Sequence, residues 1–309
     1  MTGVFLTTLS KVSVLLIFIG LGYLLRRTQK LPDNGGRVLS LLTTLVFSPA
    51  YTIKNLSGNL RLEKIGTQVA LIGYGAVIVL ITIGLAYGLA KLLARNDFER
   101  SSCVYAFSIP NFGYFGYPLV ESVFGSAVMG QMMIFGLPLN IACNTFGYLL
   151  FVKNKKLTFI DVIKMPVVAA VLVGAAIGLS GLTLPPLVTD VLTAAGNCMS
   201  PASMLLAGFA LGGFPLKELF KGGRSYMMSA IRLVGIPAVF GGILYLLGVR
   251  GMYLALPIMT LCMPLGLNLV VFPESMGIDA SQNAKMCFVC NLLTIVVLPF
   301  IFALLSQIM

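Results

Sequence analysis

Residues 108–118 read Ser108-Ile109-Pro110-Asn111-Phe112-Gly113-Tyr114-Phe115-Gly116-Tyr117-Pro118. Two prolines and two glycines in this stretch predict an interrupted helix, because proline in a helix interior costs about 3 kcal/mol or more. A second stretch, between Pro257 and Pro273, predicts a second interruption and reads Met263-Pro264-Leu265-Gly266-Leu267-Asn268. Irregular backbone at membrane depth is tolerated only where it is buried in protein or lines a wet cavity. We therefore expect a binding site at the two breaks, with a simple proline kink as the alternative.

The chain around these breaks has the composition of a helical membrane protein. Of its 309 residues 58% are hydrophobic and 10% are charged, too little charge to cover the surface of a soluble domain. The apolar residues fall in runs of roughly 20, the length of a helix that crosses the hydrocarbon core of a bilayer. We expect an all-α membrane protein with ten spans at 4–25, 38–56, 67–93, 101–121, 127–152, 166–181, 187–213, 225–248, 251–273 and 283–307.

The net charge of +11 is a signal of membrane topology, and we expect no nucleic-acid partner. Most basic residues follow the first, third, fifth and seventh spans: Arg26, Arg27, Lys30, Arg37, Lys91, Arg95, Arg100, Lys153, Lys155, Lys156, Lys164, Lys217, Lys221 and Arg224. Loops on the cytoplasmic side carry the excess of Lys and Arg, where they face anionic lipid. The pattern predicts a multi-pass protein of the cell (inner) membrane, in contact with the lipid bilayer and with both termini outside the cytoplasm.

The two halves of the chain resemble each other at a shift of 152 to 155 residues. The matched pairs keep the same order along the chain: Lys11 with Lys164, Gly22 with Gly174, Ser48-Pro49-Ala50 with Ser200-Pro201-Ala202, Pro110 with Pro264, and Tyr117-Pro118 with Phe272-Pro273. We expect a first five-helix repeat at 1–152, a short cytoplasmic linker at 153–165 and a second repeat at 166–309. Five spans per half is an odd number, so the second half enters the membrane from the opposite side and the repeat is inverted, as in many secondary transporters.

Several short motifs resemble the auxin efflux carrier family of membrane transporters. They are the Gly20–Leu25 region with Arg26-Arg27, Phe47-Ser48-Pro49-Ala50, residues 110–118, Phe124-Gly125, Ser200-Pro201-Ala202-Ser203 with Gly208, Arg232-Leu233 with Pro237, and Met263-Pro264 with Asn268. Bacterial members of that family are described as malonate or malate permeases, and plant members include the PIN-formed auxin exporters. The plant exporters have a long cytoplasmic loop between the halves, whereas this chain has a short one around Lys153–Lys164.

The resemblance implies a five-plus-five inverted repeat similar to the bile-acid sodium symporter fold, with broken fourth and ninth helices that cross. It implies transport of a small organic anion, a carboxylate such as malonate, malate or an auxin-like acid, by an elevator-like motion. A membrane channel or a non-transporting membrane scaffold is the alternative function, and the occurrence of a homodimer is left open.

Two asparagines beside the breaks are the first candidates for substrate contact. The amides of Asn111 and Asn268 can bond a carboxylate, or they can cap loose backbone. Ser48 and Ser200 precede matched prolines and are further candidates, although a serine that bonds its own helix is the commoner case. By position alone, the remaining expected cavity residues are Pro110, Gly113, Tyr114, Gly116, Pro264, Leu265 and Gly266.

Arg232 is a basic residue well inside an expected span, which makes it a functional candidate. Its alternative is to snorkel, because its side chain is long enough to extend toward the membrane surface. Asn140 and Asn144 lie four residues apart on one helix face, and Asn291 lies in the tenth span. We keep Asn144 and Asn291 as further candidates, with hydrogen bonds between helices as the explanation that suffices for all three.

The chain lacks the residues of the common catalytic and metal sites. It has no histidine, and no acidic residue falls firmly in the middle of an expected span. Serine-protease and metalloprotease chemistry therefore lack their residues, and we expect neither an enzyme nor a resident cofactor. The six cysteines fall in apolar spans, where we interpret them as small core residues. A coupling Na⁺ or H⁺ stays open, since sodium could be bound by carbonyl and amide oxygens.

Overall fold

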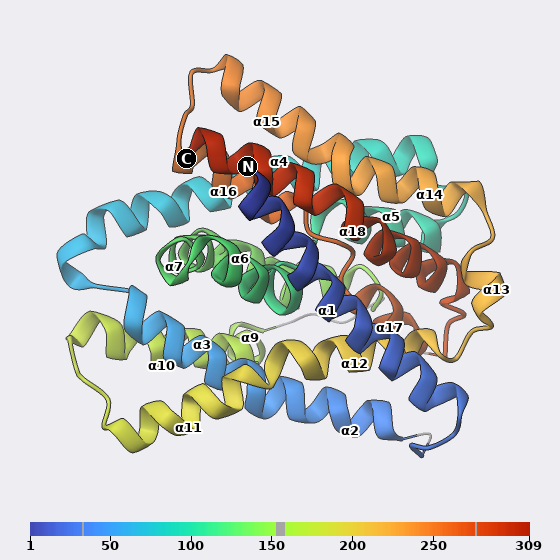
Figure 1. Cartoon of the computed structure of the whole chain (residues 1–309), viewed down its shortest axis with the longest axis horizontal. Coiled ribbons are helices and arrows are strands. Elements are labelled where there is room, and N and C mark those ends of the chain that lie inside the picture. The colour runs from blue at the N-terminus through green and yellow to red at the C-terminus, as the bar shows by residue number, and fades with distance from the viewer. Residues whose placement is uncertain (33, 153–157, 276) are drawn as a thin grey trace.

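The computed structural model describes residues 1–32, 34–152, 158–275 and 277–309, so Lys153, Lys155 and Lys156 of the expected linker lie outside the described part. Within these ranges every regular element is helical (Figure 1). The helices of the first half are α1 Thr2–Arg27, α2 Gly35–Leu42, α3 Ser48–Asn59, α4 Ile65–Leu93, α5 Asp97–Ser108, α6 Tyr117–Phe124, α7 Ser126–Phe135 and α8 Leu137–Ala142. Those of the second half are α9 Phe159–Ile163, α10 Pro166–Ser180, α11 Pro186–Asn197, α12 Met199–Leu211, α13 Leu216–Leu219, α14 Gly223–Ala230, α15 Ile236–Leu246, α16 Met252–Leu261, α17 Asn268–Ser275 and α18 Ser281–Ile308.

The chain is a multi-pass membrane protein. In the described part of the chain, five helical segments are long and apolar enough to cross a bilayer: Thr2–Arg27, Leu62–Leu93, Pro186–Leu211, Gly223–Leu246 and Ser281–Ile308. The segments Ser126–Phe135 and Leu137–Gly147, which meet at a bend of 54°, are a sixth if the pair crosses as one broken span rather than as a re-entrant loop. Helices also occupy the other expected runs, but in shorter or broken pieces, so the count of ten crossings stays a prediction.

Three of the interior prolines follow a widened, π-helical turn. These turns are η1 Thr43–Phe47, η3 Phe112–Gly116 and η5 Ile231–Gly235, and each lies directly before a helix whose second residue is proline, namely Pro49, Pro118 or Pro237. Proline lacks an N–H group, and its ring clashes with the carbonyl four residues earlier. The wider turn accommodates that carbonyl without ending the helix. A fourth such turn, η4 Cys143–Gly147, follows α8.

Glycines bring α1 and α12 into backbone contact. A side chain at Gly22 would overlap the carbonyl of Leu205, and one at Gly208 would overlap the carbonyl of Ile19. Small residues of this kind allow membrane helices to approach closely. The pair α3 and α10 is similar, because a Cβ atom at Gly174 would lie 3.1 Å from the Cα atom of Ile53.

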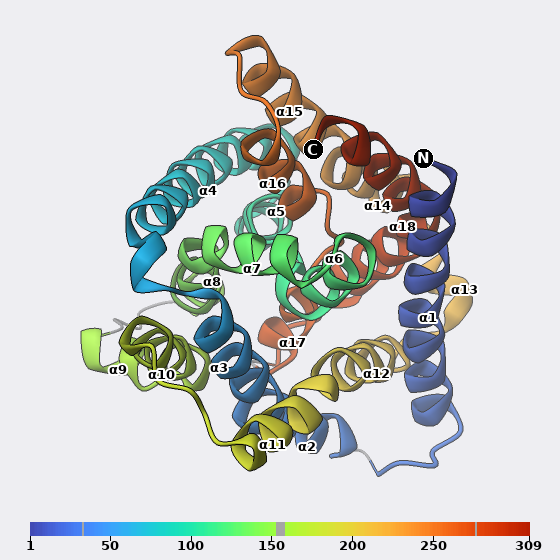
Figure 2. The same cartoon turned by 60° about the vertical axis from the view of Figure 1, so that its left-hand side comes forward.

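The two predicted interruptions meet each other inside the protein. Helix α5 ends at Ser108 and α16 ends at Leu261, and the irregular segments that follow form an antiparallel bridge between Pro110 and Leu265. The Asn111 N–H donates to the Pro264 carbonyl at 2.8 Å. Helices α6 and α7 lie beside this crossing in the middle of the molecule, enclosed by α1, α3, α4, α12 and α18 (Figure 2). The crossing of the broken segments thus lies in the protein interior.

Candidate functional site

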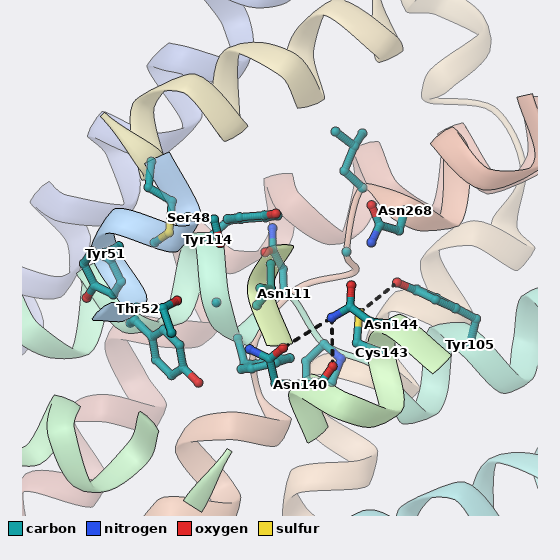
Figure 3. A pocket seen from close by; sticks show the side chains of 18 residues that line it. Ser48, Tyr51, Thr52, Tyr105, Asn111, Tyr114, Asn140, Cys143, Asn144 and Asn268 are labelled. Atoms are coloured by element: carbon teal, nitrogen blue, oxygen red, sulfur yellow. Dashed lines mark hydrogen bonds between the residues drawn. The ribbon is translucent and has the colours of Figure 1, made fainter. Parts of the chain in front are cut away.

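A small cavity lies at the crossing of the two broken segments (Figure 3). Its volume is about 80 Å³, which is room for a handful of waters or one small solute, at about 10–15 Å³ per water. Among the described residues, its lining contains no lysine, arginine, aspartate or glutamate. The lining residues are Ser48, Tyr51, Thr52, Tyr105, Pro110, Asn111, Phe112, Gly113, Tyr114, Tyr117, Asn140, Cys143, Asn144, Val167, Met199, Gly266, Leu267 and Asn268. The cavity is therefore polar but carries no formal charge of its own.

Asn111 and Asn268 occupy equivalent places in the two broken segments. Asn111 directly precedes η3, which continues into α6, and Asn268 is the first residue of α17. An asparagine at such a position often caps the helix, but the Asn111 side chain makes no capping hydrogen bond. Its amide points into the cavity (Figure 3), and the residue as a whole is buried, with an exposed fraction of 7%. Each half-helix thus begins at the cavity with an amide side chain beside its N-terminus.

A second pair of amides reaches the cavity from α8 and η4. The Asn144 Nδ2 donates to the backbone oxygen of Asn140 at 2.9 Å and to its side-chain oxygen at 3.2 Å. Asn291 likewise bonds its own helix, with Nδ2 2.7 Å from the Cys287 carbonyl oxygen. The expectation of bonds between helices is therefore wrong for Asn144 and Asn291, because the carbonyl one turn earlier is the nearer acceptor.

The aromatic wall of the cavity is anchored through hydroxyl contacts. The Tyr105 hydroxyl lies 3.6 Å from Cys143 Sγ, and Tyr105 also interacts with Asn268. The Tyr51 hydroxyl donates to Glu121 Oε2 at 3.3 Å, which connects a cavity residue to a carboxylate of α6. These contacts link α3, α5, α6, α17 and η4 around the cavity.

The structure places eight of the predicted site residues in the cavity lining: Ser48, Pro110, Asn111, Gly113, Tyr114, Asn144, Gly266 and Asn268. Six others lie elsewhere: Gly116, Ser200, Arg232, Pro264, Leu265 and Asn291. Gly116 is packed against Met263 and Met132, and Ser200 is buried with a hydroxyl that has no partner among the described residues. Pro264 and Leu265 contribute to the crossing through their backbone.

Sequence reasoning missed the walls contributed by other helices. Tyr51 and Thr52 lie three and four residues after Ser48 in α3, so helical periodicity from Ser48 could have found them. Tyr105 lies one turn before the first break. Val167 and Met199 come from α10 and α12, and nothing local in the sequence connects them with the breaks. They reach the cavity only through tertiary packing.

Arg232 does not snorkel. Its side chain in η5 is fully buried, and its Nη1 donates to the Phe107 carbonyl at 3.3 Å, near the end of α5. It is therefore directed toward the crossing rather than the membrane surface, although it does not line the cavity.

The site has the groups needed to bind a small solute. Amide and hydroxyl groups can donate hydrogen bonds to a solute, and a helix N-terminus carries about half a positive charge. Among the described residues, no group of three or more Cys, Asp or Glu side chains could hold a metal ion. An all-helical membrane protein with an interior polar cavity at crossed, broken helices has the architecture of a membrane transporter.

Comparison with known proteins gives the family. The model of a family described as membrane transport proteins matches residues 7–158 and 150–302, so the chain belongs to this family. This confirms the resemblance to auxin efflux carriers. The chain is also 23% identical over 309 residues to an uncharacterized transporter of Methanothermobacter thermautotrophicus, with 96% of this chain and 98% of the relative covered.

Proposed function

We propose that this membrane transporter carries a small organic anion by alternating access of elevator type. The substrate class is a carboxylate such as malonate, malate or an auxin-like acid. The observation that carries the proposal is the convergence of Asn111, Asn140, Asn144 and Asn268 on one uncharged interior cavity, beside the N-termini of two half-helices.

The chemistry of the cavity favours a carboxylate over a cation. A hydrogen bond to a charged group contributes about 1.5–3 kcal/mol, and backbone N–H groups at helix N-termini already favour anions. Two such bonds would suffice for recognition without a lysine or arginine in the lining. A site without fixed charge also binds weakly enough to release its solute on the other side of the membrane.

The tight helix pairs support the inverted repeat of five plus five helices. Gly22 of α1 meets Leu205 of α12, and Gly174 of α10 meets Ile53 of α3. Both members of the first contact map onto the second at the shift of 152 residues that relates the two halves of the sequence. The two contacts are therefore equivalent under exchange of the repeats 1–152 and 166–309, as a two-fold axis in the membrane plane requires.

The same contacts suggest which parts move. Close backbone packing joins α1 to α12 and α3 to α10, while the hydrogen bond from Asn111 to Pro264 joins the two broken segments. We infer that the crossing travels as one body past a frame that contains the glycine contacts. Placement in the inner membrane with both termini outside the cytoplasm and a homodimeric assembly belong to the same proposal, which leaves the coupling ion, Na⁺ or H⁺, open.

Counterflow in proteoliposomes tests the proposal. Labelled malonate, malate and indole-3-acetate are the probes, and Asn111→Ala and Asn268→Ala are the variants. We expect saturable exchange of at least one probe, lowered about 10-fold or more in both variants by loss of a charge-assisted hydrogen bond. Asn55→Ala is the matched control, because Asn55 is equally buried but bonds the Tyr51 carbonyl in its own helix.

Three results would contradict the proposal. Unchanged exchange in both cavity variants would move the site elsewhere. Single-channel currents in a planar bilayer, without saturable counterflow, would indicate a channel, and inactivity toward every probe and every cation tested would indicate a scaffold.

A further inference from the structure

Arg232 carries a buried positive charge that the uncharged lining of the cavity does not balance. It is the largest fully buried side chain of the protein's described residues, and it lies in η5, inside a segment of membrane-crossing length. A charged side chain at this depth is costly unless another group balances it. None of the described carboxylates forms an ion pair with it.

The guanidinium is also poorly satisfied in hydrogen bonds. Its Nη1 has one long bond, 3.3 Å to the Phe107 carbonyl, whereas Nε and Nη2 have no partner among the described residues. Its charge interacts with two thiol groups, those of Cys262 and Cys290. Such neutral neighbours do not account for a buried cation, so the balancing negative potential has another source.

The ends of two half-helices supply that potential. Phe107 lies in the last turn of α5, and Cys262 directly follows the last residue of α16. Cys290 of α18 contacts the backbone of Leu265, in the second irregular segment. Both α5 and α16 therefore direct their C-termini toward the region of Arg232. A helix C-terminus carries about half a negative charge, so one guanidinium balances two of them.

We propose that Arg232 is a fixed internal cation that occupies the place where a sodium ion would otherwise neutralise these two helix ends. The wild-type chain therefore needs no sodium at these two helix ends, and this place in the fold does not couple transport to a sodium gradient. The part of this inference that concerns ion coupling rests on the proposed function. The position of the Arg232 charge at the two helix ends is a property of the folded chain and does not depend on what is transported. The N-terminal ends at the crossing face the solute, while the C-terminal ends face a cation that belongs to the protein.

Thermal unfolding of the purified full chain, in sodium chloride against choline chloride at equal ionic strength, tests the inference. The chain has no tryptophan, but Cys103, Cys262, Cys287 and Cys290 are buried, so a thiol-reactive fluorophore reports unfolding. We expect the melting temperature of the wild type to differ by less than about 1 °C between the two salts. In Arg232→Gln the vacated site binds sodium, and saturating sodium raises the melting temperature by about 5 °C or more.

Two further variants control for the arginine itself. Arg232→Lys keeps the charge and is expected to remain insensitive to sodium. Arg250→Gln removes an arginine that also bonds carbonyls around a helix end, that of Tyr245 in the last turn of α15 and that of Val249 just beyond it, but at an exposed position where water can replace it. This variant is expected to show no sodium response.

Each outcome decides the matter. A saturable sodium shift in the wild type overturns the inference, and so does the absence of a shift in Arg232→Gln. If Arg232→Gln can be recovered only in sodium-containing buffer, that dependence supports the inference. Failure of both Arg232→Gln and Arg232→Lys to fold in either salt overturns the inference. The measurement needs no transported solute, so it remains valid even if no carboxylate is exchanged in counterflow.

Discussion

Replacing Asn111 by aspartate is the sharpest test of anion recognition at the crossing. Asn111→Asp preserves the size of the side chain but exchanges an amide donor for a negative charge inside the cavity. Two unit charges about 4 Å apart repel by about 4 kcal/mol at an effective dielectric constant of about 20. That repulsion alone weakens binding of a carboxylate by about 1000-fold.

Comparison with Asn111→Ala separates the effect of the added negative charge from the effect of the lost hydrogen-bond donor. Asn111→Ala removes only the hydrogen bond, so we expect affinity to fall about 10- to 150-fold, from a loss of about 1.5–3 kcal/mol. Asn111→Asp is therefore expected to bind the carboxylate substantially more weakly than Asn111→Ala. Because the site is buried, this difference should persist at high ionic strength.

Isothermal titration of the purified variants with the carboxylate exchanged in counterflow measures these affinities. Melting temperatures without ligand serve as the control for folding. Equal affinities of Asn111→Asp and Asn111→Ala would refute the view that the solute carries its negative charge next to Asn111. Tighter binding by Asn111→Asp would mean that the cavity holds a cation.

Three further predictions concern packing, the serines and the exposed charges. Gly22→Ala should destabilise the protein by about 1–3 kcal/mol through overlap with the Leu205 carbonyl, whereas Gly20→Ala, with nothing within 4 Å, should not lower the melting temperature; equal effects of the two would contradict the packing. Ser48→Ala should slow counterflow because Ser48 lines the cavity. Ser200→Ala should leave both exchange and stability unchanged because the buried Ser200 hydroxyl has no described partner. Slower exchange in Ser200→Ala would mean that Ser200 belongs to the site. The hydrogen bond from Lys221 holds the pKa of Glu218 below its usual 4.5, so this contribution to stability is present above that pH and is lost as the pH falls through the lowered pKa. The melting temperature of the wild type should therefore fall more on acidification than that of Glu218→Gln. Parallel curves of melting temperature against pH for the two proteins would count against the ion pair.

The sequence predicts the breaks because their cause is local. Pro110 and Pro264 each remove a backbone hydrogen bond wherever the helix lies, so the interruptions follow from residue type alone. The pairing of the two breaks depends on tertiary structure, and so does the direction of each side chain in them. Leu265 is buried in the core while its neighbour Gly266 lines the cavity, as expected where extended backbone turns successive residues to opposite sides.

The location of Arg232 illustrates a different limit. Its sequence position allows the side chain to extend to the surface or into the protein, and only the packing of α5 and α16 beside it decides between them. The cavity walls from α10 and α12 were missed for the same reason. Residues that reach a site from distant helices carry no local signal of it.

The widened turn η1 determines which face of α3 lines the cavity. A π-helical turn holds one residue more than the surrounding α-helix, and one residue corresponds to about 100° of rotation. Deleting a single residue within Thr43–Phe47 would let the segment close into a regular α-helix and swing Ser48, Tyr51 and Thr52 away from the cavity by about that angle. The number of residues in η1 thus fixes the rotation of α3 about its own axis. Related chains that differ by one residue here would place a different set of α3 side chains in the cavity.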